Sequence, residues 1–189
     1  GSLLMGIALP LNPLQILWVN FFTDSFPAVA FAFEKEAGGL SRRPVKGKVK
    51  LFDPLMKFLI FAIGIPTSLL LFVLYVVLLK LGFDVPTVRT FIFAAFGTYS
   101  LLLAFSVRSL EKSIFSYPLF SNAYLNGGIG IGLVLMAAAI YHPGLQTVFE
   151  TVALPLNWVI GVLCIGLLNI ALIEVAKGFF RRRAVSPVN

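Results

Sequence analysis

Long apolar stretches separated by short polar ones dominate the chain. Five such stretches lie near residues 14–33, 54–81, 87–107, 122–141 and 158–177. Each is long enough to cross a hydrocarbon core about 30 Å thick as a helix. The apolar and polar residues do not alternate as they would in strands, and a helix satisfies its own backbone groups in lipid. We therefore predict an all-α fold, an integral membrane bundle of five transmembrane helices.

The composition agrees with this pattern. Hydrophobic residues make up 59% of the 189 residues and charged residues only 12%, whereas soluble domains carry about 25% charged residues. The mean hydropathy is +0.96. We expect residues 1–189 to form a single transmembrane domain in contact with the lipid bilayer. The second stretch contains Gly64 and Pro66 and is longer than a span requires, which favours a tilt or a kink.

Positive charge is distributed unequally between the two sides of the predicted bundle. The loop at residues 34–53 is basic, and all but two of the 15 lysines and arginines lie in this loop, in the third loop, in the C-terminal tail or at the ends of the adjoining spans. The positive-inside rule then puts the loop at 34–53 and the C-terminus in the cytoplasm. The basic residues do not follow one amphipathic face, which excludes a nucleic acid as partner.

The first predicted helix carries the candidate chemistry. Asn20, Thr23 and Asp24 have the spacing that places three side chains on one face of an α-helix. A charged side chain at mid-membrane costs roughly 3 kcal/mol on insertion scales, so Asp24 is a functional candidate by default. The alternative is that Asn20 and Thr23 only pack helices together, while Asp24 binds a lysine or a backbone group.

Pro27 follows the carboxylate by three residues. A proline has no N–H for the carbonyl of Thr23, and its ring crowds that carbonyl. We therefore expect the helix to open around residues 23–27, with Asp24 or Ser25 capping a second half. Broken helices with exposed carbonyl groups hold ions in transporters.

The ligand atoms indicate the kind of ion. Carboxylate, amide and hydroxyl oxygens suit hard cations such as Ca²⁺, Mg²⁺, Na⁺ or K⁺. One carboxylate and four or five oxygens fall short of the six to eight that Ca²⁺ prefers, so we expect the site to be incomplete within this chain. The opening residues look like the tail of an earlier apolar segment, and we expect the sequence to be part of a longer protein.

A family resemblance supports the same interpretation. The residues from Pro13 to Ala28, PLQILWVNFFTDSFPA, closely resemble the sixth transmembrane helix of type II P-type cation-transporting ATPases, the family that includes calcium pumps. The rest of the chain resembles helices seven to ten of the same family. The resemblance implies that Asn20, Thr23 and Asp24 are cation ligands and that Ca²⁺ is the favoured ion. It also implies upstream helices and cytoplasmic domains as partners, and a prokaryotic inner membrane as location.

The resemblance limits what this chain does alone. The phosphorylation motif D-K-T-G-T is absent from the sequence, so we expect ATP to be used only in a full-length parent. We predict no catalytic and no cofactor-binding residue here. Ser25 stands where many reticulum pumps have Gly. Ser100 stands where two-ion calcium pumps carry an acid, which suggests one ion site.

Other polar and small residues have structural interpretations. We expect the glycines Gly128, Gly132, Gly161 and Gly166 to pack helices. We expect Glu174 to pair with Lys177 or an interfacial arginine, and His142 to lie on the surface. The patch Thr98, Tyr99 and Ser100 is expected to pack helices rather than touch an ion.

Two other classes of function remain compatible with the residues alone. The chain could be a stand-alone oligomeric channel or a secondary transporter subunit, with Asp24 from several copies completing a site. It could also be a structural membrane subunit in which Asp24 serves as an assembly anchor.

Overall fold

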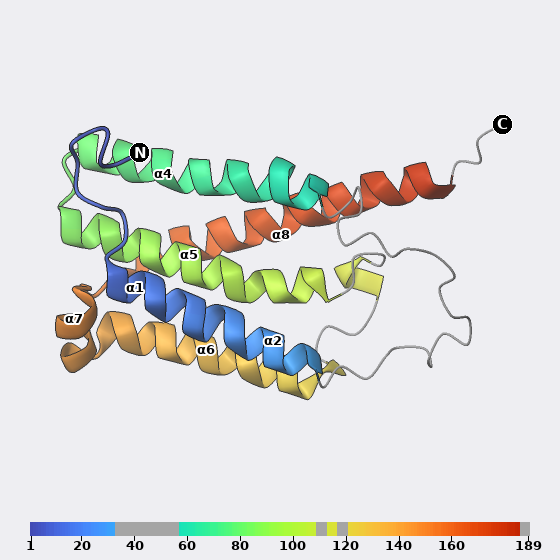
Figure 1. Ribbon diagram of the computed structural model, residues 1–189. Coiled ribbons are helices and arrows are strands. Elements are labelled where there is room, and N and C mark those ends of the chain that lie inside the picture. The colour runs from blue at the N-terminus through green and yellow to red at the C-terminus, as the bar shows by residue number, and fades with distance from the viewer. Residues whose placement is uncertain (33–56, 109–112, 117–120, 186–189) are drawn as a thin grey trace.

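The computed structural model describes residues 1–32, 57–108, 113–116 and 121–185, and every regular element within these ranges is helical (Figure 1). The elements are α1 (Pro13–Trp18), η1 (Val19–Asp24), α2 (Ser25–Ala32), η2 (Leu59–Gly64), α4 (Ile65–Lys80), α5 (Val85–Val107), η3 (Ile114–Ser116), α6 (Ala123–Tyr141), α7 (Pro143–Phe149) and α8 (Leu156–Val185). The all-α membrane bundle predicted from the sequence is confirmed. The predicted basic loop at 34–53 lies outside the described residues.

Among the residues that the structure describes, three helices are long and apolar enough to cross a membrane. They are Val85–Val107, Ala123–Tyr141 and the Leu156–Phe179 part of α8, while Ile65–Lys80 is a shorter apolar helix. These helices lie over four of the stretches singled out in the sequence. Five complete spans therefore stay a prediction for the segments near 14–33 and 54–81.

The central helix is α5. It packs against α8, α6, α4 and η1, and Phe93 and Leu101 on it are fully buried. One core cluster gathers Trp18, Tyr75 and Phe93 with their neighbours, and a second joins Ala30 of α2 to Leu101 and Ile129. The first predicted helix is thus held against α5 and α6 along its length.

Glycines let these helices approach one another. A Cβ placed on Gly132 would lie 2.6 Å from Leu101 Cδ2, and one on Gly128 would lie 3.4 Å from the Phe26 carbonyl oxygen. Gly161 and Gly166 similarly face Phe91 and Leu102. The prediction that these four glycines serve helix packing is confirmed.

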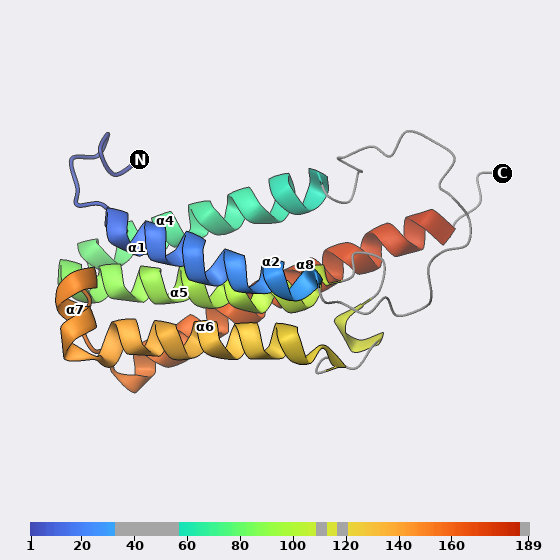
Figure 2. The same cartoon turned by 60° about the horizontal axis from the view of Figure 1, so that its bottom comes forward.

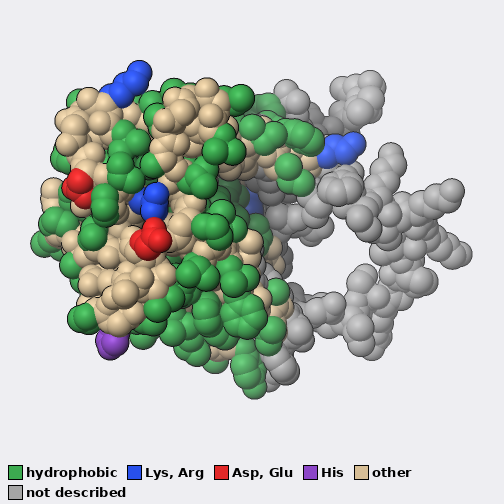
Figure 3. All heavy atoms as spheres, turned by 60° about the vertical axis from the view of Figure 1, so that its left-hand side comes forward, with side chains coloured by type: hydrophobic (Ala, Val, Ile, Leu, Met, Phe, Trp, Pro, Cys, Tyr) green, Lys and Arg blue, Asp and Glu red, His purple; other side chains and the backbone are tan. Residues whose placement is uncertain are grey.

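The two ends of the bundle differ. Residues 1–12, the turn after α4 and the short helix α7 lie together at one end, whereas α2, α5 and α8 terminate at the other (Figures 1 and 2). The end that carries α7 shows only a few charged side chains among hydrophobic and uncharged atoms (Figure 3). The Tyr75 hydroxyl donates to the Ala8 carbonyl at 2.9 Å and thereby ties residues 1–12 to α4.

Two helices that begin at this end, α5 and α1, have side-chain N-caps. Asp84 is the N-cap of α5, and its carboxylate accepts the Thr87 N–H at 2.9 Å. This backbone hydrogen bond holds the pKa of Asp84 below its usual value, since it stabilises the charged form. At the start of α1, Asn12 and Gln15 form a reciprocal capping box, with Pro13 in the first turn.

Candidate cation site

The three candidate ligands share one π-helical turn. Asn20, Thr23 and Asp24 all belong to η1, which joins α1 to α2 without a gap. In a π turn each backbone N–H donates to the carbonyl group five residues earlier instead of four. Such turns occur often at functional sites. The polar segment of the first helix is therefore also its irregular segment.

The sequence predicted that the helix opens around residues 23–27 with a new cap at Asp24 or Ser25, and the cap is wrong: the structure has a continuous helix with a π turn. Ser25 has φ −70° and ψ −42°, which are helical values, so it does not cap a separate second helix. The irregularity also begins earlier than residues 23–27, at Val19. The physical reason is that a widened turn can relieve the crowding between the proline ring and the preceding carbonyl without a chain break.

Thr23 points into the bundle. Its side chain is 1% exposed, and its hydroxyl donates to the Val19 carbonyl at 2.6 Å. A Cβ on Gly97 of α5 would lie 3.6 Å from Thr23 Cγ2 and would overlap Met136 Cε. Because Gly97 has no side chain, Thr23 of η1 and Met136 of α6 can pack directly against α5.

Asn20 lies in different surroundings. It is exposed, whereas Thr23 is buried. A π turn contains more residues than an α turn, so each residue rotates less around the helix axis. Three residues then fall further short of a full turn than in an α-helix, and Asn20 and Thr23 no longer share one face. The backbone of Asp24 closes the same turn, but its side chain lies outside what the structure describes.

The described part of the chain contains no cluster of ionisable metal ligands. No group of three or more His, Cys, Asp or Glu side chains occurs among its residues. The exposed Cys164 and the exposed His142 stand apart from η1 in the sequence. Ligand oxygens beyond those of η1 have to be sought among backbone groups or in other segments.

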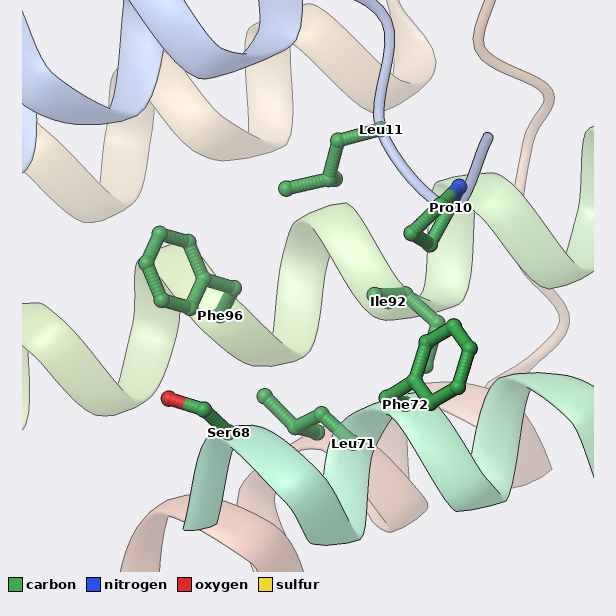
Figure 4. Close-up of a pocket in the computed structure, with 7 residues that line it drawn as sticks. All are labelled: Pro10, Leu11, Ser68, Leu71, Phe72, Ile92 and Phe96. Atoms are coloured by element: carbon green, nitrogen blue, oxygen red, sulfur yellow. The ribbon is translucent and has the colours of Figure 1, made fainter. Parts of the chain in front are cut away.

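A small pocket near α1 has the wrong chemistry for a cation. It has a volume of about 160 Å³ and is lined by Pro10, Leu11, Ser68, Leu71, Phe72, Ile92 and Phe96. The Ser68 hydroxyl is the only polar side-chain group among those lining it (Figure 4), and it donates to the Gly64 carbonyl at 3.0 Å. This pocket is a gap between residues 10–11, α4 and α5 rather than an ion site.

Other polar groups join helices. The Thr67 hydroxyl donates to Asn169 Oδ1 at 3.1 Å and links α4 to α8, a buried pair that the sequence patterns do not reveal. Thr98 is buried, and Tyr99 and Ser100 are half-buried on α5.

Glu174 and Lys177 form the predicted ion pair, with Glu174 Oε1 and Lys177 Nζ 2.8 Å apart. Lys177 is fully buried and also donates to the Ser106 carbonyl. Glu174 Oε2 accepts from the Ser113 hydroxyl at 2.9 Å and from the Ile114 N–H at 3.0 Å. The pair therefore fastens the segment after α5 to α8.

The chain is similar to known ion-transporting ATPases. The family model "Cation transporting ATPase, C-terminus" matches residues 8–179. A calcium-transporting ATPase of Bacillus subtilis is 33% identical over 188 residues, which cover 96% of this chain and 20% of that protein. Calcium-transporting ATPase 1 of Yarrowia lipolytica is 31% identical over 186 residues, covering 97% of this chain and 20% of that protein. The mouse calcium-transporting ATPase type 2C member 2 is 31% identical over 152 residues, covering 79% of this chain and 16% of that protein.

The fold and the candidate site define a class of protein: an all-α membrane bundle with a polar π turn in its first helix. The chain belongs to the C-terminal membrane domain family of cation-transporting ATPases. It spans one fifth of the length of the Bacillus and Yarrowia proteins and 16% of the mouse protein. The family resemblance drawn from the motif around Asp24 is thereby confirmed.

Proposed function

We propose that this chain is the C-terminal membrane part of an ATP-driven calcium pump and supplies part of its cation site. Asn20, Thr23 and Asp24 contribute ligand oxygens from η1. The remaining ligands, together with phosphorylation and nucleotide binding, come from other parts of the complete protein. Family membership over residues 8–179 supports this assignment, and the names of the relatives support Ca²⁺ as cargo.

The observation that carries the proposal is the coincidence of three oxygen-bearing residues with a π turn inside an apolar helix. Every other residue of η1 is apolar: Val19, Phe21 and Phe22. A polar group that faces hydrocarbon without a partner is costly, and ionisable residues at such depth mark ion pathways.

The exposure of Asn20 supports a larger assembly. It stands beside Leu17 and Phe21, which are 63% and 60% exposed. An amide on a lipid-facing surface would lack partners. We infer that helices from the rest of the complete protein cover this face and add the missing oxygens, with cytoplasmic domains of the same protein driving transport.

The number of acids limits the stoichiometry. Glu174 and Asp24 are the only acids within the predicted spans, and Glu174 is paired with Lys177. A second calcium site on α5 would lack a carboxylate, because Ser100 occupies the position discussed above. We propose one transported ion per cycle, and a prokaryotic inner membrane as the location.

The test is Asp24→Asn in the complete protein, measured as Ca²⁺-dependent ATP hydrolysis and Ca²⁺ uptake by membrane vesicles. We expect loss of both, since the amide removes the negative charge from the site. Ser25→Ala is the matched control, because it removes a neighbouring exposed hydroxyl of α2 and should leave both activities unchanged. Uptake that survives Asp24→Asn would contradict the assignment of the ligands. Uptake of Mg²⁺ or Mn²⁺ in place of Ca²⁺ would correct the cargo.

A further inference from the structure

The start of α1 is fastened to the far end of the sequence. The side-chain amide of Asn12 donates to the Phe149 carbonyl at 2.9 Å, and that of Gln15 donates to the same carbonyl at 3.0 Å. One backbone oxygen of α7 thus receives two donors, one from Gln15 of α1 and one from its N-cap Asn12, across more than 130 positions in sequence.

The backbone of α7 leaves this oxygen available. Phe149 is the last residue of α7, and Glu150 after it has φ 53° and ψ 42°, a left-handed conformation that ends the helix. The terminal carbonyl groups of a helix lack partners within it. The turn at Glu150 is therefore the reason that the Phe149 carbonyl can accept bonds from α1.

Other contacts surround the two amide bonds. Gln15 has no exposed surface. Trp18 packs edge-on against both Phe93 of α5 and Phe149, with ring centroids 5.5 Å and 6.4 Å apart. Arg89 donates to the Leu9 carbonyl at 3.2 Å and forms an ion pair with Glu150 at 2.9 Å. We refer to Asn12, Gln15 and the Phe149 carbonyl as the amide latch.

The latch lies directly before the π turn. The N–H of Val19, the first residue of η1, donates to the carbonyl groups of Gln15 and Ile16. Apolar contacts alone permit a helix to slide or rotate slightly, because they are not directional. Hydrogen bonds are directional, so the latch restricts the depth and rotation of α1 more tightly than the ring contacts of Trp18 alone.

We propose that Asn12 and Gln15 are positioning residues that hold the π turn in the orientation required for cation binding. This inference rests on the proposed function, since it assumes that Asn20, Thr23 and Asp24 bind the ion. Cation–oxygen distances are confined to a narrow range, about 2.3–2.6 Å for Ca²⁺. Loss of the latch is therefore expected to weaken cation binding without removing a ligand.

The test is the double variant Asn12→Ser with Gln15→Glu in the complete pump. The variant keeps a serine N-cap and a glutamate three residues later, a standard capping box. Because Gln15 is buried against the Phe149 carbonyl, the carboxylate also repels that carbonyl oxygen, so the variant opens the latch while it keeps the cap. Both amide donors to the Phe149 carbonyl are lost. We expect the Ca²⁺ concentration for half-maximal ATP hydrolysis to rise about tenfold, as for groups that orient metal ligands. The maximal rate and the ATP concentration dependence should stay within about twofold of the parent protein.

Gln146→Glu is the matched control. It removes an amide that donates to the Ile140 carbonyl at 2.6 Å, a bond of the same type near the same end of the bundle that does not involve α1. Its Ca²⁺ dependence should match the parent. If the double variant does not fold, Asn12→Ser alone removes one donor without adding charge, and a rise of about threefold is expected.

The outcomes separate this inference from the proposed function. An unchanged Ca²⁺ dependence in a folded latch variant, while Asp24→Asn abolishes transport, overturns the latch alone. An equal loss of Ca²⁺ affinity in Gln146→Glu also overturns it, because the effect would then be general. Transport that persists in Asp24→Asn overturns the ligand assignment itself.

Discussion

At the scale of single residues, Lys177 shows how the bundle accommodates a buried charge. Its ammonium group contacts one carboxylate and one backbone carbonyl and has no exposed surface. Removing one member of a buried pair leaves the other charge without compensation. The side chain of Lys177 thus links α8 to α5.

We expect Lys177→Met to lower the free energy of unfolding by about 3 kcal/mol, because the largely buried Glu174 would lose its only paired cation. Thermal unfolding in detergent measures this change. The double variant Glu174→Gln with Lys177→Met should be more stable than Lys177→Met alone, since no uncompensated charge remains. A double variant that loses stability further would contradict this account.

The residue types that sequence patterns predict best are those with strong local preferences. Glu174 and Lys177 are three positions apart, so a helix brings them together without further information. Asn12, Pro13 and Gln15 also have the residue types of a helix start, but the predicted span began only at residue 14, and the structure shows their capping box. That Phe149 is their shared acceptor, and that Thr67 meets Asn169, depends on packing between helices distant in sequence.

At the scale of elements, two helices carry the same irregularity. A π turn ends at Asp24, with Pro27 three residues later, and another ends at Gly64, with Pro66 two residues later. A helix-interior proline removes one backbone donor and crowds the carbonyl four residues before it. The sequence locates such irregularities, but the choice between a break and a widened turn depends on the surrounding helices.

We predict that Pro27→Ala lowers cation affinity about tenfold in the complete protein, because the turn can revert to α-helical geometry and rotate its ligands. The Ca²⁺ dependence of ATP hydrolysis measures the change. Pro66→Ala is the control: it removes the proline that follows the second π turn, which carries no candidate ligand. An equal effect of both variants would show that the two prolines act only through stability.

At the scale of the whole molecule, the sequence predicts the class more securely than the site. Apolar length and the scarcity of charge define the membrane bundle, since both follow from the cost of polar groups in lipid. The partition of Asn20 and Thr23 between exposed and buried surroundings could not be predicted, because it depends on a turn that departs from α-helical spacing.

The orientation of the bundle is a prediction at this scale. Residues 1–12 and α7 lie at one end, and α2 and α8 terminate at the other (Figure 1), where most basic residues of the predicted loops belong. We propose that the C-terminal end faces the cytoplasm. Cys164 is the only cysteine of these 189 residues. In this chain with Cys164→Ser, Ser186→Cys tests the predicted cytoplasmic tail, and Thr147→Cys tests the end that carries α7.

A membrane-impermeant maleimide should label the Ser186→Cys variant only in inverted vesicles and the Thr147→Cys variant only in right-side-out vesicles. Detergent-permeabilised vesicles, in which both variants should react, control for the reactivity of each cysteine. The reverse pattern would place the basic segments outside and contradict the positive-inside assignment.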